Sequence, residues 1–300
     1  MTMIYTPPPA PREDCYLTEE QLKQYDEIGF VVLPSVLDED DLAGVKRAMN
    51  NKVEWMAKGW LEDGLIPSLY EDEPFESRLA KIASHLTEEQ YLRHGRGWRD
   101  RDPGYYDLMS NPKILNAVES LIGPEIFSNP VYNTRPKVPG VAAGAVPWHQ
   151  DKSYWPDANS NPVITVWVPI VEANLLNGCL HIWPRTHREK VLTWHREDYS
   201  GTGFLEIDDE HLTKAEREMV AIPVAAGSMI LFNDRCIHMS TLNRAETVRW
   251  SVDLRYQPTD QDPMPSHGVG FLARSHKHPE RVATEEDWLA LRPEREPQTA

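Results

Sequence analysis

The sequence predicts a mostly β protein with helices at its N-terminal end, and three observations support this fold class. After Gly123 the chain consists of short β-rich runs separated by proline, glycine and asparagine, a texture typical of a sandwich or barrel. Before Gly123, amphipathic segments flanked by capping residues predict helices. With 300 residues, 40% of them hydrophobic and ten of them tryptophan, the chain can bury a sizeable core. We expect one domain over residues 16–300, preceded by a proline-rich extended arm, residues 1–15.

The helical part begins at Thr18, a predicted N-cap, and its first helix should end at Gly29. The run "FVVLP" directly after Gly29 predicts a short strand that proline ends. A second helix should begin after Asp38, and a third should occupy residues 111–123, between an Asn-Pro start and a glycine.

The β-rich part contains several candidate strands separated by turn residues. They are "EIFSNPVYNTRPKV", "VITVWVPIV", "GCLHIW", "VAIPV", "SMILFN" and "TVRWSVDLRYQ". A helical insertion, "LTKAEREMV", is predicted between the last strands, and "ATEEDWLAL" predicts a short helix in the loop-rich tail.

Charge and composition exclude several classes of partner. A formal charge of −16 argues against binding to duplex nucleic acid or anionic lipid, because both need a basic face. The sequence has no apolar run of 18 residues, and its start lacks the features of a signal peptide, so we expect a cytoplasmic protein. Three widely spaced cysteines, without a C-x-x-C pair, are expected to be free thiols: Cys15, Cys179 and Cys236. The expected partner is a small-molecule substrate, and the expected assembly is a monomer or homodimer.

The stretch "PWHQDKSYWP" raises the question of a metal site, because His149 and Asp151 are separated by one residue. Residues i and i+2 of a strand face the same way, so both side chains can point into one cavity. The H-x-[DE] pattern occurs four times, but the other three instances lie in charged stretches without a strand pattern. His238, 87 residues beyond Asp151 and just after an apolar strand, supplies a third candidate ligand. Two imidazoles and one carboxylate form the facial triad of non-haem Fe(II) oxygenases.

The run "TVRWSVDLRY" places polar and apolar side chains on opposite faces of one strand. The polar face carries Arg249, Ser251, Asp253 and Arg255, and the apolar face can pack against covering helices. A polar face inside a barrel needs partners for its charges, and a buried guanidinium suits the carboxylate of a ligand. The alternative is a strand with a solvent-exposed polar face.

These elements resemble the phytanoyl-CoA dioxygenase family of Fe(II)/2-oxoglutarate-dependent oxygenases. The resemblance runs from "LTEEQLKQYDEIGFVVLPSVLDEDDL" to about residue 258. "WHQD" resembles the H-x-D of the family, "NGCLHIWPRTHR" its N-G-C-L segment and the following turn, and "HMSTLNRAETVRWSVDLRYQP" its distal histidine with a downstream arginine. The resemblance implies a double-stranded β-helix core, the jelly roll of cupin-like proteins, flanked by N-terminal helices.

The resemblance also implies roles for individual residues. Fe(II) would be bound by two histidines and one aspartate: His149, Asp151 and His238. Arg249 would pair with the far carboxylate of 2-oxoglutarate, and Ser240 and Trp167 match positions that line the cosubstrate pocket. Asn133 and Lys137, on the preceding strand, are further candidates for the site, without assigned roles.

The implied reaction uses 2-oxoglutarate and O2 to hydroxylate an unactivated C–H bond of a metabolite or natural-product intermediate, with release of succinate and CO2. Asp151 occupies the position where related halogenases have a small residue, so oxygenation is favoured over halogenation. Desaturation or cyclisation by the same oxidant remains an alternative. So do a cupin-type metalloenzyme without a cosubstrate and a non-catalytic metal- or ligand-binding protein.

One basic and aromatic segment, "YLRHGRGWRDRDPGYYD" at residues 91–107, stands out in an acidic chain. Its glycines and four arginines predict a loop that closes over substrate, with Trp98 and an arginine reaching it. The alternative is a surface loop whose arginines pair with carboxylates.

Overall fold

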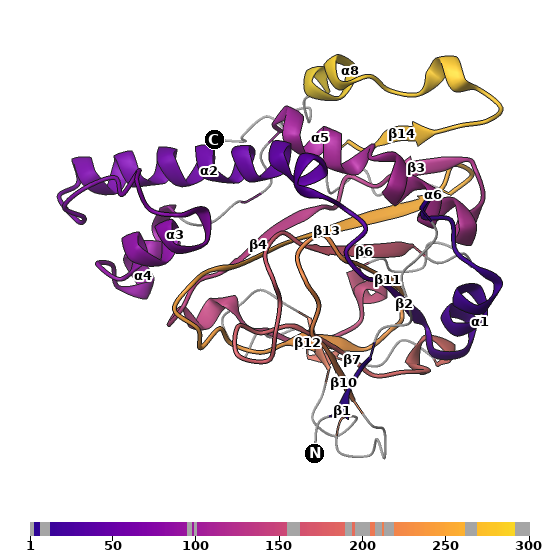
Figure 1. Ribbon diagram of the computed structural model, residues 1–300, viewed down its shortest axis with the longest axis horizontal. Coiled ribbons are helices and arrows are strands. Elements are labelled where there is room, and N and C mark those ends of the chain that lie inside the picture. The colour runs from indigo at the N-terminus through magenta and orange to yellow at the C-terminus, as the bar shows by residue number, and fades with distance from the viewer. Residues whose placement is uncertain are drawn as a thin grey trace.

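Two facing β-sheets form the core of the protein, as the computed structural model shows (Figure 1). The structure describes residues 3–6, 13–94, 98, 101–154, 163–189, 194–195, 205–207, 212, 219–261 and 269–291. The larger sheet has the order β14 (Phe271–Arg274), β3 (Ile126–Ser128), β13 (Arg249–Pro258), β6 (Ile164–Pro169), β11 (Met229–Asn233) and β2 (Phe30–Leu33), and β4 (Asn133–Lys137) also pairs with β13.

The smaller sheet lies below the larger one in Figure 1. Its order is β1 (Met3–Ile4), β10 (Val220–Ile222), β7 (Leu180–Ile182), β12 (His238–Ser240) and β5 (Val146–His149). A separate ladder joins β8 (Trp194–His195) to β9 (Glu206–Ile207). Between the two sheets, apolar side chains of β2 and β11 pack against those of β7 and β10: Phe30, Val32, Ile230, Phe232, Leu180, Ile182, Val220 and Ile222. The expected fold class, a mostly β protein with a double-stranded β-helix core, is confirmed.

Helices begin where the sequence supplies capping residues. Thr18 and Asp38 each form a complete capping box, and Gly29 ends the first helix with a left-handed φ of 89°. Asn111 caps the helix that precedes Gly123. The helices are α1 (Glu19–Ile28), α2 (Glu39–Glu62), α3 (Phe75–Ala83), α4 (Glu88–His94), α5 (Pro103–Met109), α6 (Pro112–Ile122) and α8 (Glu285–Ala290), with 3-10 turns η1 (Ala142–Gly144), η2 (Asp151–Tyr154), η3 (Thr186–Arg188) and η5 (Pro279–Arg281).

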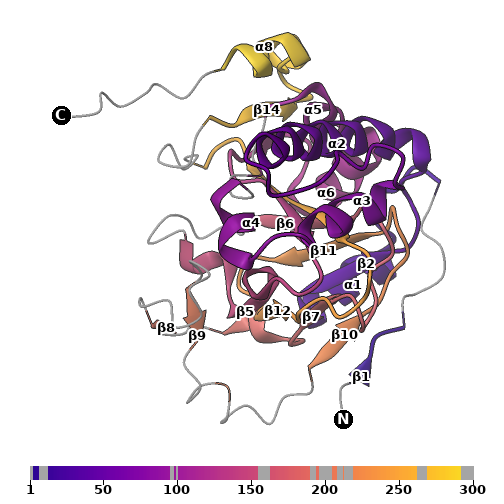
Figure 2. The same ribbon diagram turned by 90° about the vertical axis from the view of Figure 1, so that its left-hand side faces the viewer.

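The helices α2, α5 and α6 cover the side of the larger sheet that faces away from the smaller one (Figures 1 and 2). The apolar face of β13 packs into this layer. The ring of Trp250 stacks on Phe75 at 5.2 Å and meets Trp98 edge-on at 5.3 Å, and the Tyr256 hydroxyl donates to the carbonyl of Met109. The predicted contact between this face of the strand and the covering helices is therefore confirmed, so the opposite, polar face must line the space between the sheets.

Some sequence expectations differ in detail. The run "EIFSNPVYNTRPKV" forms two strands, β3 and β4, because the chain turns at residues 129–132 before β4 pairs with β13. His238 begins a strand of its own, β12, in the smaller sheet, and does not simply cap the preceding strand β11 of the larger sheet. Met3–Ile4 pairs in parallel with β10 despite the prolines nearby, so part of the predicted arm joins a sheet. The division into domains at residue 15 remains a prediction.

The segment 91–107 is only partly a loop. Residues 91–94 complete α4 and residues 103–107 begin α5. Trp98 is buried against the core, and Arg101 donates to the carbonyl of Trp288 and lies 5.7 Å from its ring. Arg101 therefore contacts the C-terminal helix α8. Residues 95–97, 99 and 100, like most of the predicted helix "LTKAEREMV", lie outside the described residues, and the role of a lid remains a prediction.

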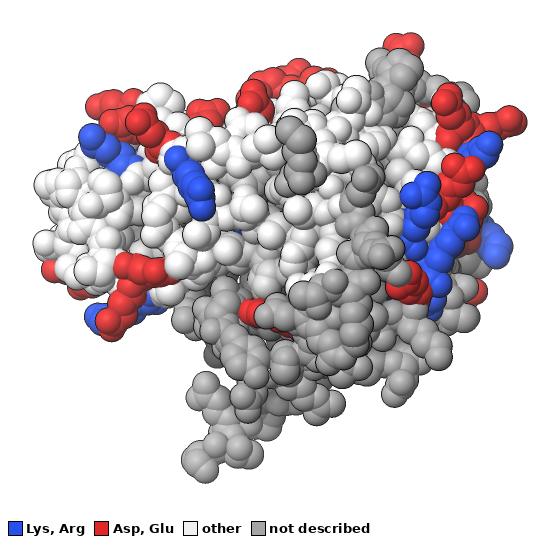
Figure 3. Space-filling model, turned by 90° about the horizontal axis from the view of Figure 1, so that it is seen from below, with Lys and Arg blue, Asp and Glu red and all other residues white. Residues whose placement is uncertain are grey.

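On the face shown in Figure 3, lysines and arginines of the described residues lie beside acidic side chains. The helices among the described residues include none with the length and apolarity needed to cross a bilayer. All three cysteines are free, as expected from their spacing, and all three are buried.

Candidate metal centre and adjoining pocket

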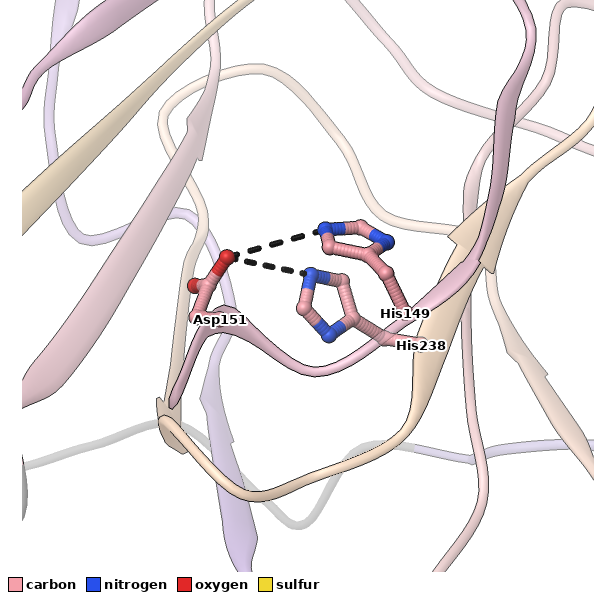
Figure 4. A group of neighbouring side chains, drawn as sticks. All are labelled: His149, Asp151 and His238. Atoms are coloured by element: carbon pink, nitrogen blue, oxygen red, sulfur yellow. Dashed lines mark ion pairs between the residues drawn. The ribbon is translucent and has the colours of Figure 1, made fainter. Parts of the chain in front are cut away.

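Three side chains from two neighbouring strands of the smaller sheet, and from the turn that follows one of them, converge on one point (Figure 4). His149 is the last residue of β5, Asp151 follows in the turn η2, and His238 is the first residue of β12. His238 lies directly opposite His149 in the antiparallel pair of β12 and β5, which places the two imidazole rings 4.1 Å apart. Strand pairing thus joins a third ligand to the H-x-D pair.

The distances are those of a metal-binding group. The Oδ1 atom of Asp151 lies 3.6 Å from Nε2 of His149 and 3.8 Å from Nε2 of His238, and all three side chains are buried. One ligand atom from each residue lies within 4.8 Å of the other two. Among the described residues, no other group of three or more histidine, cysteine or acidic side chains meets this condition. Of the other H-x-[DE] pairs, the two that lie within the described residues do not: the ring of His278, for example, is exposed and lies 3.3 Å from Glu280.

Backbone carbonyls orient both imidazoles toward this point. Nδ1 of His149 lies 2.9 Å from the carbonyl of Pro147, and Nδ1 of His238 lies 2.9 Å from the carbonyl of Cys236. Because a carbonyl only accepts, each Nδ1 carries the proton and each Nε2 presents a lone pair. Burial and the neighbouring His149 lower the pKa of His238 to about 3, so its ring is neutral and able to bind a metal.

Asp151 is fixed by side chains of the opposite sheet. Its Oδ2 atom accepts from Arg255 at 2.8 Å and from the Thr165 hydroxyl at 2.7 Å. Burial opposes ionisation of this carboxyl, but Arg255 and the two imidazoles hold the pKa of Asp151 well below its usual value. It is therefore a carboxylate. Sequence analysis placed Arg255 on the polar face of β13 but did not foresee its contact with Asp151, and Thr165 was missed.

A small pocket of about 40 Å³ adjoins the metal centre and brings together the residues expected to bind the cosubstrate. Its walls include His149 and His238 together with Trp167, Ser240 and Arg249. Asp253 and Arg255 also line it, so the polar face of β13 faces the interior as predicted.

Three arginines line this pocket, and Arg249 is the one that pairs with no carboxylate among the described residues. It is 2% exposed, it donates to the hydroxyl of Ser251, and its guanidinium lies 5.5 Å from the ring of Trp167. Its Nε has no hydrogen-bond partner within the described part of the chain. Burial, with the positive charge of Arg135, lowers the pKa of Arg249 to about 9, which leaves it charged at neutral pH. A buried guanidinium in this condition is complementary to an anionic ligand.

A second pocket, of about 150 Å³, shares Arg135, Val146 and Arg249 with the first. Lys137 lines this second pocket. Its Nζ lies 2.5 to 3.2 Å from the carbonyl oxygens of Gly144, Ser240 and Thr241, next to the end of β12. Asn133 donates to Asp253 at 2.7 Å. Both residues therefore support the walls of the site, at a distance from the metal ligands.

The donor set fits Fe(II). Two imidazoles and one carboxylate, grouped on one side of a point that opens into a pocket, form the facial triad that leaves other coordination positions available. A double-stranded β-helix that carries this triad between its sheets defines the class of mononuclear non-haem metal oxygenases.

Comparison with known proteins identifies the family. Residues 25–251 match the model of the phytanoyl-CoA dioxygenase (PhyH) family. The chain is 24% identical over 253 residues to the peroxisomal phytanoyl-CoA dioxygenase of Bos taurus, covering 82% of this chain and 70% of that protein. The chain belongs to the phytanoyl-CoA dioxygenase family of Fe(II)/2-oxoglutarate-dependent oxygenases, which confirms the resemblance seen in its sequence.

Solved structures share the fold. The α-ketoglutarate-dependent carbocyclase SnoK from nogalamycin biosynthesis superposes with a TM-score of 0.52 at 17% identity, covering 92% of this chain and 95% of that one. EctD from S. alaskensis, with 2-oxoglutarate and 5-hydroxyectoine, gives a TM-score of 0.53 at 18% identity, covering 96% and 86%. At this level of identity the likeness concerns the fold.

Proposed function

We propose that this oxygenase hydroxylates an unactivated C–H bond of a small-molecule metabolite or natural-product intermediate. The observation that carries the proposal is the buried triad beside Arg249, a buried cation without a carboxylate partner among the described residues. A metal-binding protein that uses no cosubstrate has no need for such an arginine, because burying an unpaired charge is costly.

His149, His238 and Asp151 would hold the iron, through Nε2 of each histidine and Oδ1 of the aspartate. When bound, Fe(II) and 2-oxoglutarate supply the activation of O2 and the oxidation of a substrate C–H bond, with release of succinate and CO2. The carbonyl groups that accept from each Nδ1 keep both rings in the orientation that binding requires.

Arg249 would bind the far carboxylate of 2-oxoglutarate. Its planar guanidinium can donate to both oxygens at once, and the ring of Trp167 flanks it on one side. Ser240 lines the same pocket and offers a hydroxyl. Because these groups lie on β6, β12 and β13, the strands of both sheets together determine where the cosubstrate lies relative to the metal.

Asp151 bears on the outcome of the reaction. A carboxylate at this position occupies the coordination site that a halide would need, which supports oxygen transfer as the reaction. Burial of the triad also keeps bulk water away from the reacting bond. Fold likeness does not choose among hydroxylation, desaturation and cyclisation, since the structurally similar SnoK is a carbocyclase.

The test has two stages. A panel of candidate metabolites is first screened for succinate release by the full chain with Fe(II), 2-oxoglutarate and ascorbate; metal binding without substrate-dependent succinate would point to a non-catalytic protein. For an accepted substrate, the products are then analysed under ¹⁸O2. One labelled oxygen in succinate and one in the product supports hydroxylation. Label in succinate alone, with a product that has lost two hydrogens, refutes it and indicates desaturation or cyclisation.

A further inference from the structure

The two oxygens of Asp151 have different partners. Oδ1 faces the two imidazoles, whereas Oδ2 faces the larger sheet and accepts from Arg255 and Thr165. Arg255 and Thr165 lie directly opposite each other in the pairing of β13 with β6, so both donors come from one place on the inner face of that sheet. The side of the carboxylate away from the metal centre is thus fully engaged.

Arg255 is itself held in place by a second carboxylate. Its Nη1 lies 3.0 Å from Oδ2 of Asp253, while its Nη2 lies 2.8 Å from Oδ2 of Asp151. Asp253 in turn accepts from Asn133 at 2.7 Å and from Nε of Arg135 at 3.0 Å. Asp253 and Arg255 are two residues apart on β13, so the strand aims both inward. One guanidinium therefore spans two buried carboxylates in a fixed orientation.

This arrangement bears on the number of positions open at a bound metal. With only Oδ1 and two imidazole nitrogens as ligands, a six-coordinate ion keeps three positions. A carboxylate that turned and bound through both oxygens would leave two. A cosubstrate that chelates through two atoms and O2 together need three.

We propose that Arg255 is a positioning residue that restricts Asp151 to ligation through one oxygen and so keeps three coordination positions open. Asp253 holds Arg255 in the orientation that this requires. The inference rests on the proposed metal site, and it adds a role for a residue that acts on the metal centre through its contact with Asp151.

The experiment counts the water molecules on a bound metal. The full chain is saturated with Mn(II), which accepts imidazole and carboxylate ligands, and the relaxation of water protons per bound Mn(II) is measured. Wild-type protein and His149→Ala are compared first. Absence of Mn(II) binding in the wild type, or full binding in folded His149→Ala, would overturn the metal site itself and with it this inference.

Once the metal site is established, the next variant is Arg255→Met, which keeps an unbranched apolar stem and removes the guanidinium donors. The relaxation enhancement per bound Mn(II) should fall by about one third, because the second oxygen of Asp151 replaces one of three waters. Arg255→Lys should restore most of the enhancement, since its ammonium can still donate to Oδ2. The matched control is Arg274→Met, which removes an arginine paired with Glu119 outside the site and should leave the enhancement unchanged.

An enhancement per bound Mn(II) that is the same in Arg255→Met and the wild type overturns the inference while leaving the metal site intact. The double variant Arg255→Met/Asp253→Asn removes both ions of the supporting pair, so it avoids leaving the buried Asp253 with Arg135 as its one remaining ion-pair partner among the described residues. It provides the same test where the single variant does not fold. The same loss of about one third is expected, and an unchanged enhancement again refutes the role of Arg255.

Discussion

Replacing Arg249 by alanine should weaken the binding of 2-oxoglutarate and leave the metal in place. The guanidinium is 2% exposed, its Nε has no partner, and no described carboxylate pairs with it. A hydrogen bond to a charged group contributes about 1.5 to 3 kcal/mol. Since each 1.4 kcal/mol is a factor of ten, the dissociation constant should rise by about 10- to 150-fold.

The structure also predicts which features of the arginine matter. Arg249→Lys retains the charge but loses the planar fork that binds two oxygens, so the loss should lie between the wild type and Arg249→Ala. Trp167 remains in both variants and keeps its contact with the pocket. Arg274→Ala removes an arginine that binds Glu119 and Asn116 outside the pocket, so it should leave cosubstrate affinity unchanged.

The assay is calorimetric titration of 2-oxoglutarate into the Mn(II)-loaded protein without oxygen, after Mn(II) affinity has been measured for each variant. The reasoning requires that Mn(II) affinity stay near the wild-type value in Arg249→Ala, because Arg249 does not contact the triad. An unchanged affinity for 2-oxoglutarate in a folded, metal-loaded Arg249→Ala protein would refute the assignment and move the role to another cation of the pocket wall, such as Arg135.

Three further predictions address the metal, the reaction and the stability. His238→Ala should abolish Fe(II) binding in the folded protein, because two remaining ligands hold the ion poorly; full iron occupancy, measured by elemental analysis, would contradict this. Asp151→Gly should abolish hydroxylation and open a position for chloride without ensuring chlorination; mass spectrometry of products formed with and without chloride checks it, and retained hydroxylation would speak against Asp151 as a ligand. Burial, with the charges of Arg249 and Arg135, lowers the pKa of Lys137 from 10.5 to about 6, so between these values the unfolded chain binds a proton that the folded chain lacks. The free energy of unfolding should therefore rise with pH across that window, and Lys137→Met should remove this part of the slope in urea titrations; an identical slope in the variant would exclude Lys137 as its source.

Local patterns determined much of the fold and most of the candidate site. Capping residues predicted where α1, α2 and α6 begin, because a cap satisfies backbone groups within a few residues of itself. Alternation along β13 predicted that Arg249 and Arg255 face the interior, because successive side chains of a strand point to opposite faces of the sheet. The triad was recognised from a motif and its resemblance to a family, and the structure brings its three residues together.

Which inward-facing side chains meet depends on how the strands pair and how the two sheets face each other. Arg255 contacts Asp151 because the register of β13 against β6 places its side chain opposite the part of the smaller sheet that carries Asp151. Neither this register nor the placement of the two sheets can be read from the spacing of residues along the chain. The same pairing sets Thr165 opposite Arg255, and the pairing of β12 with β5 sets His238 opposite His149. The direction of each side chain within its strand therefore follows from the sequence. The register between distant strands, which depends on the packing of the whole core, determined the partner of each one.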